Sequence, residues 1–239
     1  MGRKFEVRKA AMAKTSLQKA KVYSRFGKEL YMCAKQGGSN PEANLALKHL
    51  IEKAKQQQVP NDVIKRNIDK ADKGLGEDYQ AIRYEGFGPE GSCFLIDALT
   101  DNVNRAVGEV RFAFTKMGSK MGVKGSVEHL FEHLSFVTLN GLDEEMVLEI
   151  LLTEDVDVQD IETEETTVTV TANGYALDTI TQVLEAHGSV EIVESEQGWF
   201  ALEDIDISTE SQEIVRRFLE RLEELDEVSH VYHNVNLED

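Results

Sequence analysis

The fold is decided by the stretch Leu134–Thr171, which reads LSFVTLNGLDEEMVLEILLTEDVDVQDIETEETTVTVT. Apolar and polar residues alternate in parts of this stretch, as in half-buried strands, and elsewhere the apolar residues recur at helical spacing. Together with the residues up to Glu194, the pattern predicts a β-α-β-β-α-β unit. The predicted strands are Leu134–Leu139, Val156–Glu162, Thr166–Thr171 and Ser189–Glu194, and the predicted helices are Glu144–Thr153 and Tyr175–His187.

The segments on either side of this unit predict a second α+β domain. Before it we expect strands at 81–85 and 93–100, a helix at 103–117, a Gly-rich loop at 116–125 and a short strand at 127–131. After it, Ser208 predicts the N-cap of a helix, and residues 229–235 predict a last strand. One helix is too few to cover a sheet. We therefore expect the C-terminal helix and strand to complete this domain, with the β-α-β-β-α-β unit inserted into it.

The first 73 residues predict three helices. The first carries an apolar stripe at helical spacing, formed by Tyr23, Phe26, Leu30 and Cys33. It ends near Gly37, the pair Asn40–Pro41 predicts the N-cap and first turn of the second helix, and Pro60 starts the third. Before Ser16 the chain is basic with little periodicity, which predicts a flexible arm. The predicted domains are a basic helical domain at 1–76, an α+β domain at 77–132 plus 204–239, and the inserted domain at 133–203.

Charge is distributed very unevenly along the chain. Up to Lys73 there are 17 Lys and Arg against 7 Asp and Glu, a formal charge of +10. The rest holds 9 basic and 37 acidic residues, a charge of −28. A cationic head on an anionic body predicts that the head faces phosphate, which repels the body. The alternative is a set of solvated, Lys-rich helix faces with no partner.

Two groups of basic residues are candidates for contact with nucleic acid. The larger lies in the arm and first helix: Arg3, Lys4, Arg8, Lys9, Lys14, Lys19, Lys21, Arg25, Lys28 and Lys35. Within it, Lys21, Arg25 and Lys28 are spaced by 4 and 3, which places them in one stripe opposite the apolar one. The second group is Lys116, Lys120 and Lys124 in the Gly-rich loop, for which an ordinary solvated loop is an equal alternative.

Two motifs superficially indicate enzymes. Gly86–Gly91 fits G-x-G-x-x-G, but a strand follows where a dinucleotide site needs a helix, so we expect a turn. His129, Glu132 and His133 match the H-x-x-E-H metallopeptidase string, which requires a helix, whereas the surrounding residues favour a strand. We expect no enzyme, cofactor, metal or small-molecule substrate. A metal-dependent hydrolase using these three residues and a pure protein-interaction module are the rival hypotheses.

The cysteines and the distribution of apolar residues indicate the cellular compartment. Cys33 and Cys93 are isolated, as in reducing compartments. No apolar run approaches the ~20 residues that span a bilayer, and the N-terminus has no secretory apolar region. We expect a cytoplasmic protein with no membrane partner.

Several blocks of residues resemble the YebC/PmpR family, whose relatives include the mitochondrial translational activator of cytochrome oxidase. They are Met1–Phe5, Ala34–Gly37, Arg83–Pro89, Leu99–Arg105, Gly125–Val127 and Tyr232–Val235. The resemblance implies a helical N-terminal domain followed by two ferredoxin-like α+β domains, one inserted in the other. This chain departs from the family pattern at Phe5, where Trp is usual, and at Lys120, where Asn is usual.

Members of that family are described as DNA-binding transcriptional regulators, and some as ribosome-associated factors that relieve stalling at proline runs. The resemblance implies DNA, ribosomal RNA or both as partners, with the ribosome itself as a further candidate. No helix-turn-helix element with base-reading residues is evident, which favours RNA or shape readout. We expect a non-enzymatic, nucleic-acid-binding regulator of gene expression, with the transcriptional and ribosomal alternatives both open.

Overall fold

The computed structural model describes residues 16–76, 78–188 and 190–237, so the predicted flexible arm before Ser16 lies outside the described residues. The chain forms two compact units. The first contains the helical region up to Ala81 with the segments Leu99–Val103 and Glu223–Ser229, and the second contains Ile82–Ala98, Asn104–Leu222 and the residues from His230 onward. The three domain ranges expected from the sequence stay predictions.

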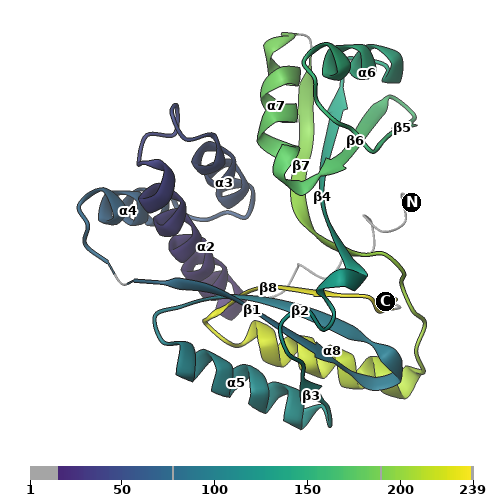
Figure 1. Cartoon of the computed structure of the whole chain (residues 1–239). Helices are drawn as coiled ribbons and strands as arrows, with labels where there is room; N and C mark the ends of the chain where they lie inside the picture. The colour runs from purple at the N-terminus through teal and green to yellow at the C-terminus, as the bar shows by residue number, and fades with distance from the viewer. Residues whose placement is uncertain (1–15, 77, 189, 238–239) are drawn as a thin grey trace. The chain divides into compact units, whose positions relative to one another are not determined.

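Three helices lie in the described part of the N-terminal region, as predicted (Figure 1). They are α2 Ser16–Gly37, α3 Leu45–Gln56 and α4 Asn61–Asp72. The predicted stripe of α2 contributes Phe26 and Leu30, which are fully buried, to one apolar core with Leu47 of α3 and Ile64 of α4. Helices of 12 residues, the length of α3 and α4, are marginal alone in water, so this shared core is what stabilises them.

The predicted start of the second helix is wrong. Asn44, not Asn40, is the N-cap of α3, and its side-chain oxygen accepts a hydrogen bond from the backbone N–H of Leu47 at 3.1 Å. The Asn44 amide also donates to two backbone carbonyls at the end of α2. This close approach needs glycine at position 37, where a Cβ would lie 2.6 Å from the Asn44 amide nitrogen. Asn40 instead closes a turn by accepting from the N–H of Glu42.

The first sheet has the strand order β3-β1-β2-β8, and α5 and α8 lie on one of its faces (Figure 1). Its elements are β1 Gln80–Phe87, β2 Cys93–Thr100, α5 Val103–Lys116, β3 Lys120–Met121, α8 Thr209–Glu223 and β8 Val228–His233. Three aromatic rings join β2, α5 and α8: Phe94 lies edge-on to Phe114 and Phe218. The C-terminal helix and strand therefore complete this layer, as the sequence predicted.

Two predictions on this sheet need correction. The loop 116–125 contains β3, which pairs antiparallel with β1, with Lys120 opposite Phe87. The strand predicted at 127–131 is instead a 3-10 turn, η3 Glu128–Leu130, followed directly by the next strand. The turn prediction for Gly86–Gly91 is correct, since η2 Pro89–Gly91 leads into β2.

The second sheet is the predicted β-α-β-β-α-β unit, with strand order β5-β6-β4-β7 and antiparallel neighbours. Its elements are β4 Phe131–Asn140, α6 Glu144–Thr153, β5 Asp160–Glu164, β6 Thr167–Asn173, η4 Gly174–Ala176, α7 Leu177–Ala186 and β7 Glu191–Ala201. The α6 bounds match the prediction. Because the unit interrupts the elements of the first sheet, the architecture is a three-helix region followed by two ferredoxin-like α+β domains, one inserted in the other.

The strand predicted from Val156 begins later, at Asp160. The N–H of Val156 bonds to the carbonyl of Leu151 in α6, and Asp155 before it has a φ of 56°. This C-cap ends the helix and delays the strand. Among the described residues, no helix is long and apolar enough to cross a membrane.

Candidate nucleic-acid interface

The cationic stripe on α2 donates hydrogen bonds to backbone carbonyls within the first unit. Lys21, Arg25 and Lys28 lie on one face of the helix, as their spacing predicts, and all three are half-buried. Their acceptors lie in the segment Glu223–Ser229. The contacts are Lys21 Nζ to Glu224 O at 3.0 Å, Lys28 Nζ to Asp226 O at 2.6 Å and Arg25 Nη1 to Ser229 O at 3.2 Å. A phosphate group would have to compete with these carbonyl oxygens.

A carboxyl group lies beside this stripe on the same helix. Glu29 Oε1 is 3.8 Å from Arg25 Nε, and the Glu29 side chain is only 15% exposed. Burial raises the pKa of Glu29, while the charges of Arg25 and Lys53 act in the opposite direction. The guanidinium of Arg25 also lies over the Phe26 ring, 5.2 Å from its centroid. Arg25 is therefore tied to its own helix as well as to a carbonyl.

Lys35 is the last candidate of the first helix and is exposed. Its Nζ lies 2.5 Å from Asp78 Oδ1 and 5.7 Å from the centroid of the Tyr31 ring. The hydrogen bond between them raises the pKa of Lys35 and lowers that of Asp78. An exposed pair of this kind is weak and screened by salt, so Lys35 remains accessible to a phosphate.

The other candidates of the first group lie outside what the structure describes. Position 19 belongs to α2, but its side chain is not described. The residues of the arm lie before the described chain: Arg3, Lys4, Arg8, Lys9 and Lys14.

A second cationic surface, on α4, was missed by the sequence reasoning. An open hollow of about 370 Å³ is lined by Asp62, Lys65, Arg66, Asp69, Lys70, Lys73 and Leu75. Its four cations are exposed and outnumber its two carboxylates. The sequence does contain a pattern that indicates this surface, since Arg66, Lys70 and Lys73 repeat the 4-and-3 spacing of the α2 stripe. This surface offers phosphate contacts without requiring that a carbonyl first be displaced.

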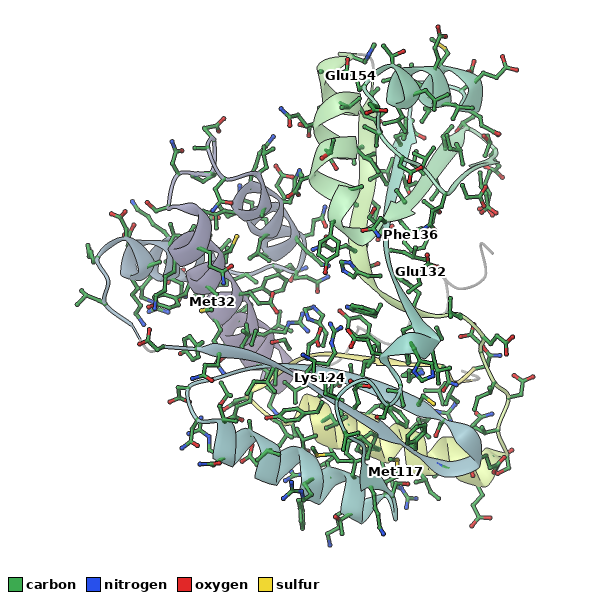
Figure 2. The ribbon with its side chains drawn as sticks, viewed as in Figure 1. Met32, Met117, Lys124, Glu132, Phe136 and Glu154 are labelled. Atoms are coloured by element: carbon green, nitrogen blue, oxygen red, sulfur yellow. The ribbon has the colours of Figure 1, made fainter. Side chains whose placement is uncertain are left out.

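In the second unit, Lys116, Lys120 and Lys124 are all exposed. Lys116 Nζ lies 5.3 Å from the centroid of the Phe112 ring on the same helix. Lys120 belongs to β3, and Lys124 directly precedes Gly125, whose φ is 82°. Figure 2 labels Lys124 with its side chain drawn. Lys116 therefore ends helix α5, whereas Lys120 and Lys124 lie on a short strand and the turn that follows it rather than on an open loop.

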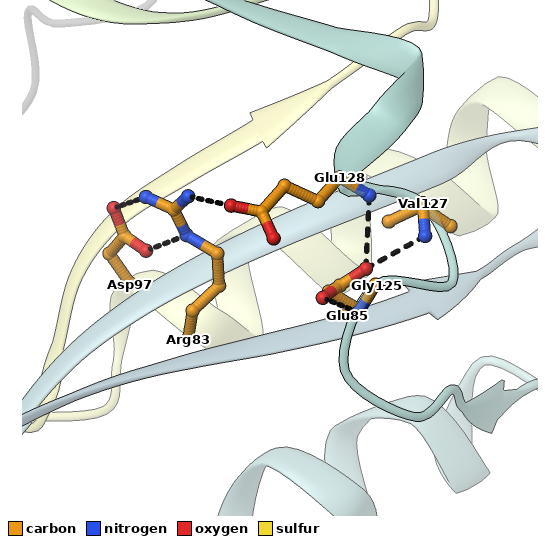
Figure 3. A network of polar contacts seen from close by, with 6 residues as sticks. All are labelled: Arg83, Glu85, Asp97, Gly125, Val127 and Glu128. Carbon is orange, nitrogen blue, oxygen red and sulfur yellow. Dashed lines mark hydrogen bonds and ion pairs between the residues drawn. The ribbon is translucent and has the colours of Figure 1, made fainter.

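That turn is fixed by one buried carboxylate, Glu85 on β1 (Figure 3). Glu85 accepts backbone hydrogen bonds from Gly125 at 2.5 Å, Val127 at 2.7 Å and Glu128 at 3.0 Å. Burial acts to raise the pKa of Glu85, but these N–H donors outweigh it, so the pKa lies below its ordinary value. The carboxylate therefore explains why residues 127–130 do not form the predicted strand, since it binds N–H groups of Val127 and Glu128 that a sheet would need.

Arg83, two residues before Glu85 on β1, completes the network in Figure 3. Its Nε and Nη2 bind both oxygens of Asp97 at 2.6 and 2.9 Å, and its Nη1 binds Glu128 at 3.0 Å. The guanidinium also lies over the Trp199 ring, 4.2 Å from the centroid. Arg83 thus belongs to a structural ion-pair network with Asp97 and Glu128, and its guanidinium is not free to bind a phosphate.

The H-x-x-E-H residues are not gathered into a metal site. Glu132 accepts a hydrogen bond from Gln159 on the neighbouring segment, and His133 lies between the rings of Tyr175 and Trp199. Burial lowers the pKa of His133, with the positive charge of Arg83 acting in the same direction. Within the described ranges, no cluster of three His, Cys, Asp or Glu side chains has a geometry that would hold a metal ion.

The inserted domain carries nearly all of the net negative charge. Residues 133–203 contain no Lys or Arg and 17 Asp and Glu, out of a chain charge of −18. Figure 2 shows oxygen-tipped side chains projecting around α6, at whose end Glu154 is labelled. A phosphate backbone is repelled by such a surface, so the cationic residues outside this domain are the better candidates for contact with nucleic acid.

Comparison with known proteins gives the family. The model described as the TACO1/YebC protein N-terminal domain matches residues 3–74, and the model described as the TACO1/YebC second and third domain matches residues 79–235. Together they account for most of the chain. Relatives in Alteromonas and Vibrio are named as probable transcriptional regulatory proteins.

The similarity to two such relatives and to one solved structure extends over nearly the full length of both chains compared. The probable transcriptional regulatory protein of Vibrio parahaemolyticus is 49% identical over 99% of this chain and 100% of its own. That of Alteromonas mediterranea is 47% identical over 98% of both chains. The crystal structure of a conserved hypothetical protein from Aquifex aeolicus has a TM-score of 0.74 and 32% identity, covering 95% of this chain and 93% of its own. The chain therefore belongs to the TACO1/YebC family, whose curated relatives here are named as regulators.

Proposed function

We propose that the protein is a non-enzymatic regulator of gene expression that binds nucleic acid through its N-terminal helical region. The observation that carries the proposal is the α4 surface, where Lys65, Arg66, Lys70 and Lys73 are exposed around one open hollow. Cations grouped on one helix face neutralise successive phosphates and release counterions. The names of the relatives as transcriptional regulators support the same reading.

The other candidate cations contribute to the same proposal in different ways. The basic residues before Ser16 extend the positive charge along the chain, and Lys35 adds a weakly paired cation. The α2 stripe contacts phosphate only where it exchanges its carbonyl acceptors. Lys116, Lys120 and Lys124 form a separate exposed group in the second unit.

RNA on the ribosome is the second candidate target, and one observation favours it. The cations of α4 follow an N-terminal turn that carries Asp62, whereas DNA-reading helices present the residues of their first turns to base edges. Contacts limited to phosphates suit recognition of RNA by shape. The transcriptional candidate rests instead on the names of the relatives.

The binding proposal is tested by titrating the full chain with duplex DNA and with a ribosomal RNA fragment at several salt concentrations. We expect the logarithm of the association constant to fall steeply and linearly with the logarithm of salt concentration for at least one of them. Absence of binding to both, or binding that salt does not weaken, would refute the proposal.

Ribosome profiling in cells with and without the protein, beside a genome-wide map of DNA occupancy, separates the two targets. Pauses at proline codons in the deleted strain without discrete DNA peaks would establish the ribosomal candidate. Discrete DNA peaks with unchanged profiles would establish the transcriptional one.

We place this activity in the cytoplasm. Neither Cys33 nor Cys93 forms a disulfide, and burial raises the pKa of the Cys93 thiol. Two cysteines outside any disulfide suit a reducing compartment. Localisation of the tagged full chain by microscopy tests this directly.

A further inference from the structure

Helix α6 in the inserted domain presents apolar side chains on both of its faces. Val147 and Leu151 are fully buried in the domain core. On the outer face, Leu148 is 39% exposed and Leu152, one turn further along, is 62% exposed. Side chains at i and i+4 lie next to each other on a helix. The two leucines therefore form an apolar strip that faces away from the core.

Carboxylates border this leucine strip on both sides. The wheel of a helix at 100° per residue places Glu144 on one side of Leu148, and Glu145 and Glu149 on the other side of the strip. All three glutamates are exposed. Glu144 leans toward β5, where its Oε2 accepts a hydrogen bond from Thr163 Oγ1 at 3.3 Å. The strip has an apolar centre and an anionic rim, which is the usual anatomy of a protein-docking surface.

The charge of the whole inserted domain selects the class of partner. With 17 carboxylates and no Lys or Arg in 133–203, the domain repels phosphate and attracts cationic protein surfaces. The uncovered face of its sheet has the same character, since Glu162 of β5 and Glu194 of β7 lie in register with the central pair Thr169 and Thr138. Nucleic acid is disfavoured on either face.

We propose that the leucine strip Leu148–Leu152 on α6 is a docking site for a basic amphipathic helix of a protein partner. Such a helix would place apolar side chains at i and i+4 between the two leucines and Lys or Arg side chains against Glu144, Glu145 and Glu149. Helix ridges that pack into helix grooves favour this arrangement. The inference is independent of the nucleic-acid proposal, because it uses a different domain and charge of the opposite sign.

The strip is tested on the full chain with a fluorescent synthetic peptide that forms an amphipathic helix, with Leu at i and i+4 and Lys on both flanks. The double variant Leu148→Gln, Leu152→Gln should weaken peptide binding by about tenfold or more, because the exposed parts of the two side chains together approach one whole leucine. Gln keeps the helix propensity of α6. The matched control is Val193→Gln, which removes a 50% exposed apolar side chain of β7 and should leave binding within about twofold.

The rim is tested separately with Glu144→Gln, Glu145→Gln and Glu149→Gln together. This triple variant should weaken binding and make its salt dependence shallower, whereas Glu162→Gln, Glu164→Gln and Glu165→Gln together should have a smaller effect on both. Equal effects of the two triples, equal binding of the leucine and Val193 variants, or equal binding of a scrambled peptide would overturn the site, since each indicates attraction by net charge alone.

A photo-crosslinking amino acid at position 152, with position 193 as control, identifies the occupant in cells. We expect crosslinks from position 152 onto Lys- and Arg-rich helical segments of a protein. Crosslinks to RNA or DNA, to a second copy of this chain, or equally from both positions would overturn the proposal.

Discussion

The two cationic stripes of the N-terminal region have the same spacing and different surroundings. On α2, Lys21, Arg25 and Lys28 donate to backbone carbonyls of the segment Glu223–Ser229. Arg66 and Lys70 of α4 and its C-cap Lys73 line an open hollow and are exposed. Periodicity alone therefore predicts which side chains share a face, and the difference between the stripes lies in what covers that face.

The difference also separates two roles that charge can have. A cation that is already bonded to a carbonyl contributes to folding, and its contact with phosphate costs that bond. A solvated cation contributes little to folding and is available to a ligand. Variants that neutralise one stripe at a time measure both roles.

The largest expected effect is on nucleic-acid binding by the α4 stripe. Changing Arg66, Lys70 and Lys73 together to Gln should make the slope of log K against log salt shallower by about 2–3 units, because each cation neutralises about one phosphate. The matched α2 change, Lys21, Arg25 and Lys28 to Gln, should alter the slope less. Titrations at several salt concentrations measure both slopes.

The control for net charge is the change of Arg216, Arg217 and Arg221 on α8 to Gln, which removes as many cations from another region. It should leave slope and affinity nearly unchanged. If the α2 variant lost more slope than the α4 variant, the carbonyl contacts would be readily exchanged and the comparison would be reversed.

The next effect is on the free energy of unfolding, and here the α2 variant should change more than the α4 variant. The α2 triple variant should lower the free energy of unfolding by about 1–3 kcal/mol, because three charged donors to backbone carbonyls are lost. The α4 triple variant should stay within about 0.5 kcal/mol of the parent. Urea unfolding followed by circular dichroism measures both, and equal losses would contradict the distinction between the stripes.

A smaller, pH-dependent effect is expected at Glu29, the buried neighbour of Arg25. Because its pKa in the folded chain is raised above the ordinary 4.5, the protonated form stabilises the fold at low pH. That stability is lost as the pH rises from about 4.5 through the raised value. Glu29→Gln cannot undergo this loss, so its stability relative to the parent should increase from acidic to neutral pH.

Unfolding of the Glu29→Gln variant and the parent at several pH values between 4 and 7 measures this difference. The exposed change Glu52→Gln on α3 is the control for the removal of one carboxylate. A difference in unfolding free energy between variant and parent that stays constant from pH 4 to pH 7 would mean that burial does not raise the pKa of Glu29.

The smallest effect is expected at Lys35. Its pair with Asp78 is exposed, and the pKa shifts of the two groups arise from a hydrogen bond that solvent screens. Lys35→Gln should leave the unfolding transition unchanged and make the binding slope shallower by at most about one unit. Asp78→Asn serves as the control, since it frees Lys35 and should not reduce the slope.

Much of the fold was predictable because helix caps and apolar repeats are visible in short stretches of the sequence. The α6 helix has a capping Asp143, an apolar repeat and a clear end, and its bounds were predicted as observed. The start of α3 was not predictable, because Asn40 and Asn44 are both suitable caps. The choice depends on the contact of Asn44 with glycine at position 37 and with carbonyls of another helix.

The candidate site was predictable only in part. The sequence indicates that the cations of the first helix share a face, but their acceptors lie about two hundred positions further along the chain. In the same way, Glu85 accepts from the N–H groups of Gly125, Val127 and Glu128, which lie 40 or more positions away. Long-range polar contacts of this kind leave no periodic trace in a sequence.

The inserted domain's lack of basic residues has a consequence for how the protein can be modified. No Lys or Arg occurs between Lys124 and Arg216, so trypsin releases residues 125–216 as one uncut fragment. No acetyl, methyl or ubiquitin group can be attached to a lysine in that region either. Enzymes that modify lysine can therefore act on the cationic helices and on Lys116, Lys120 and Lys124. The charge of the acidic domain does not change when lysines elsewhere in the chain are modified.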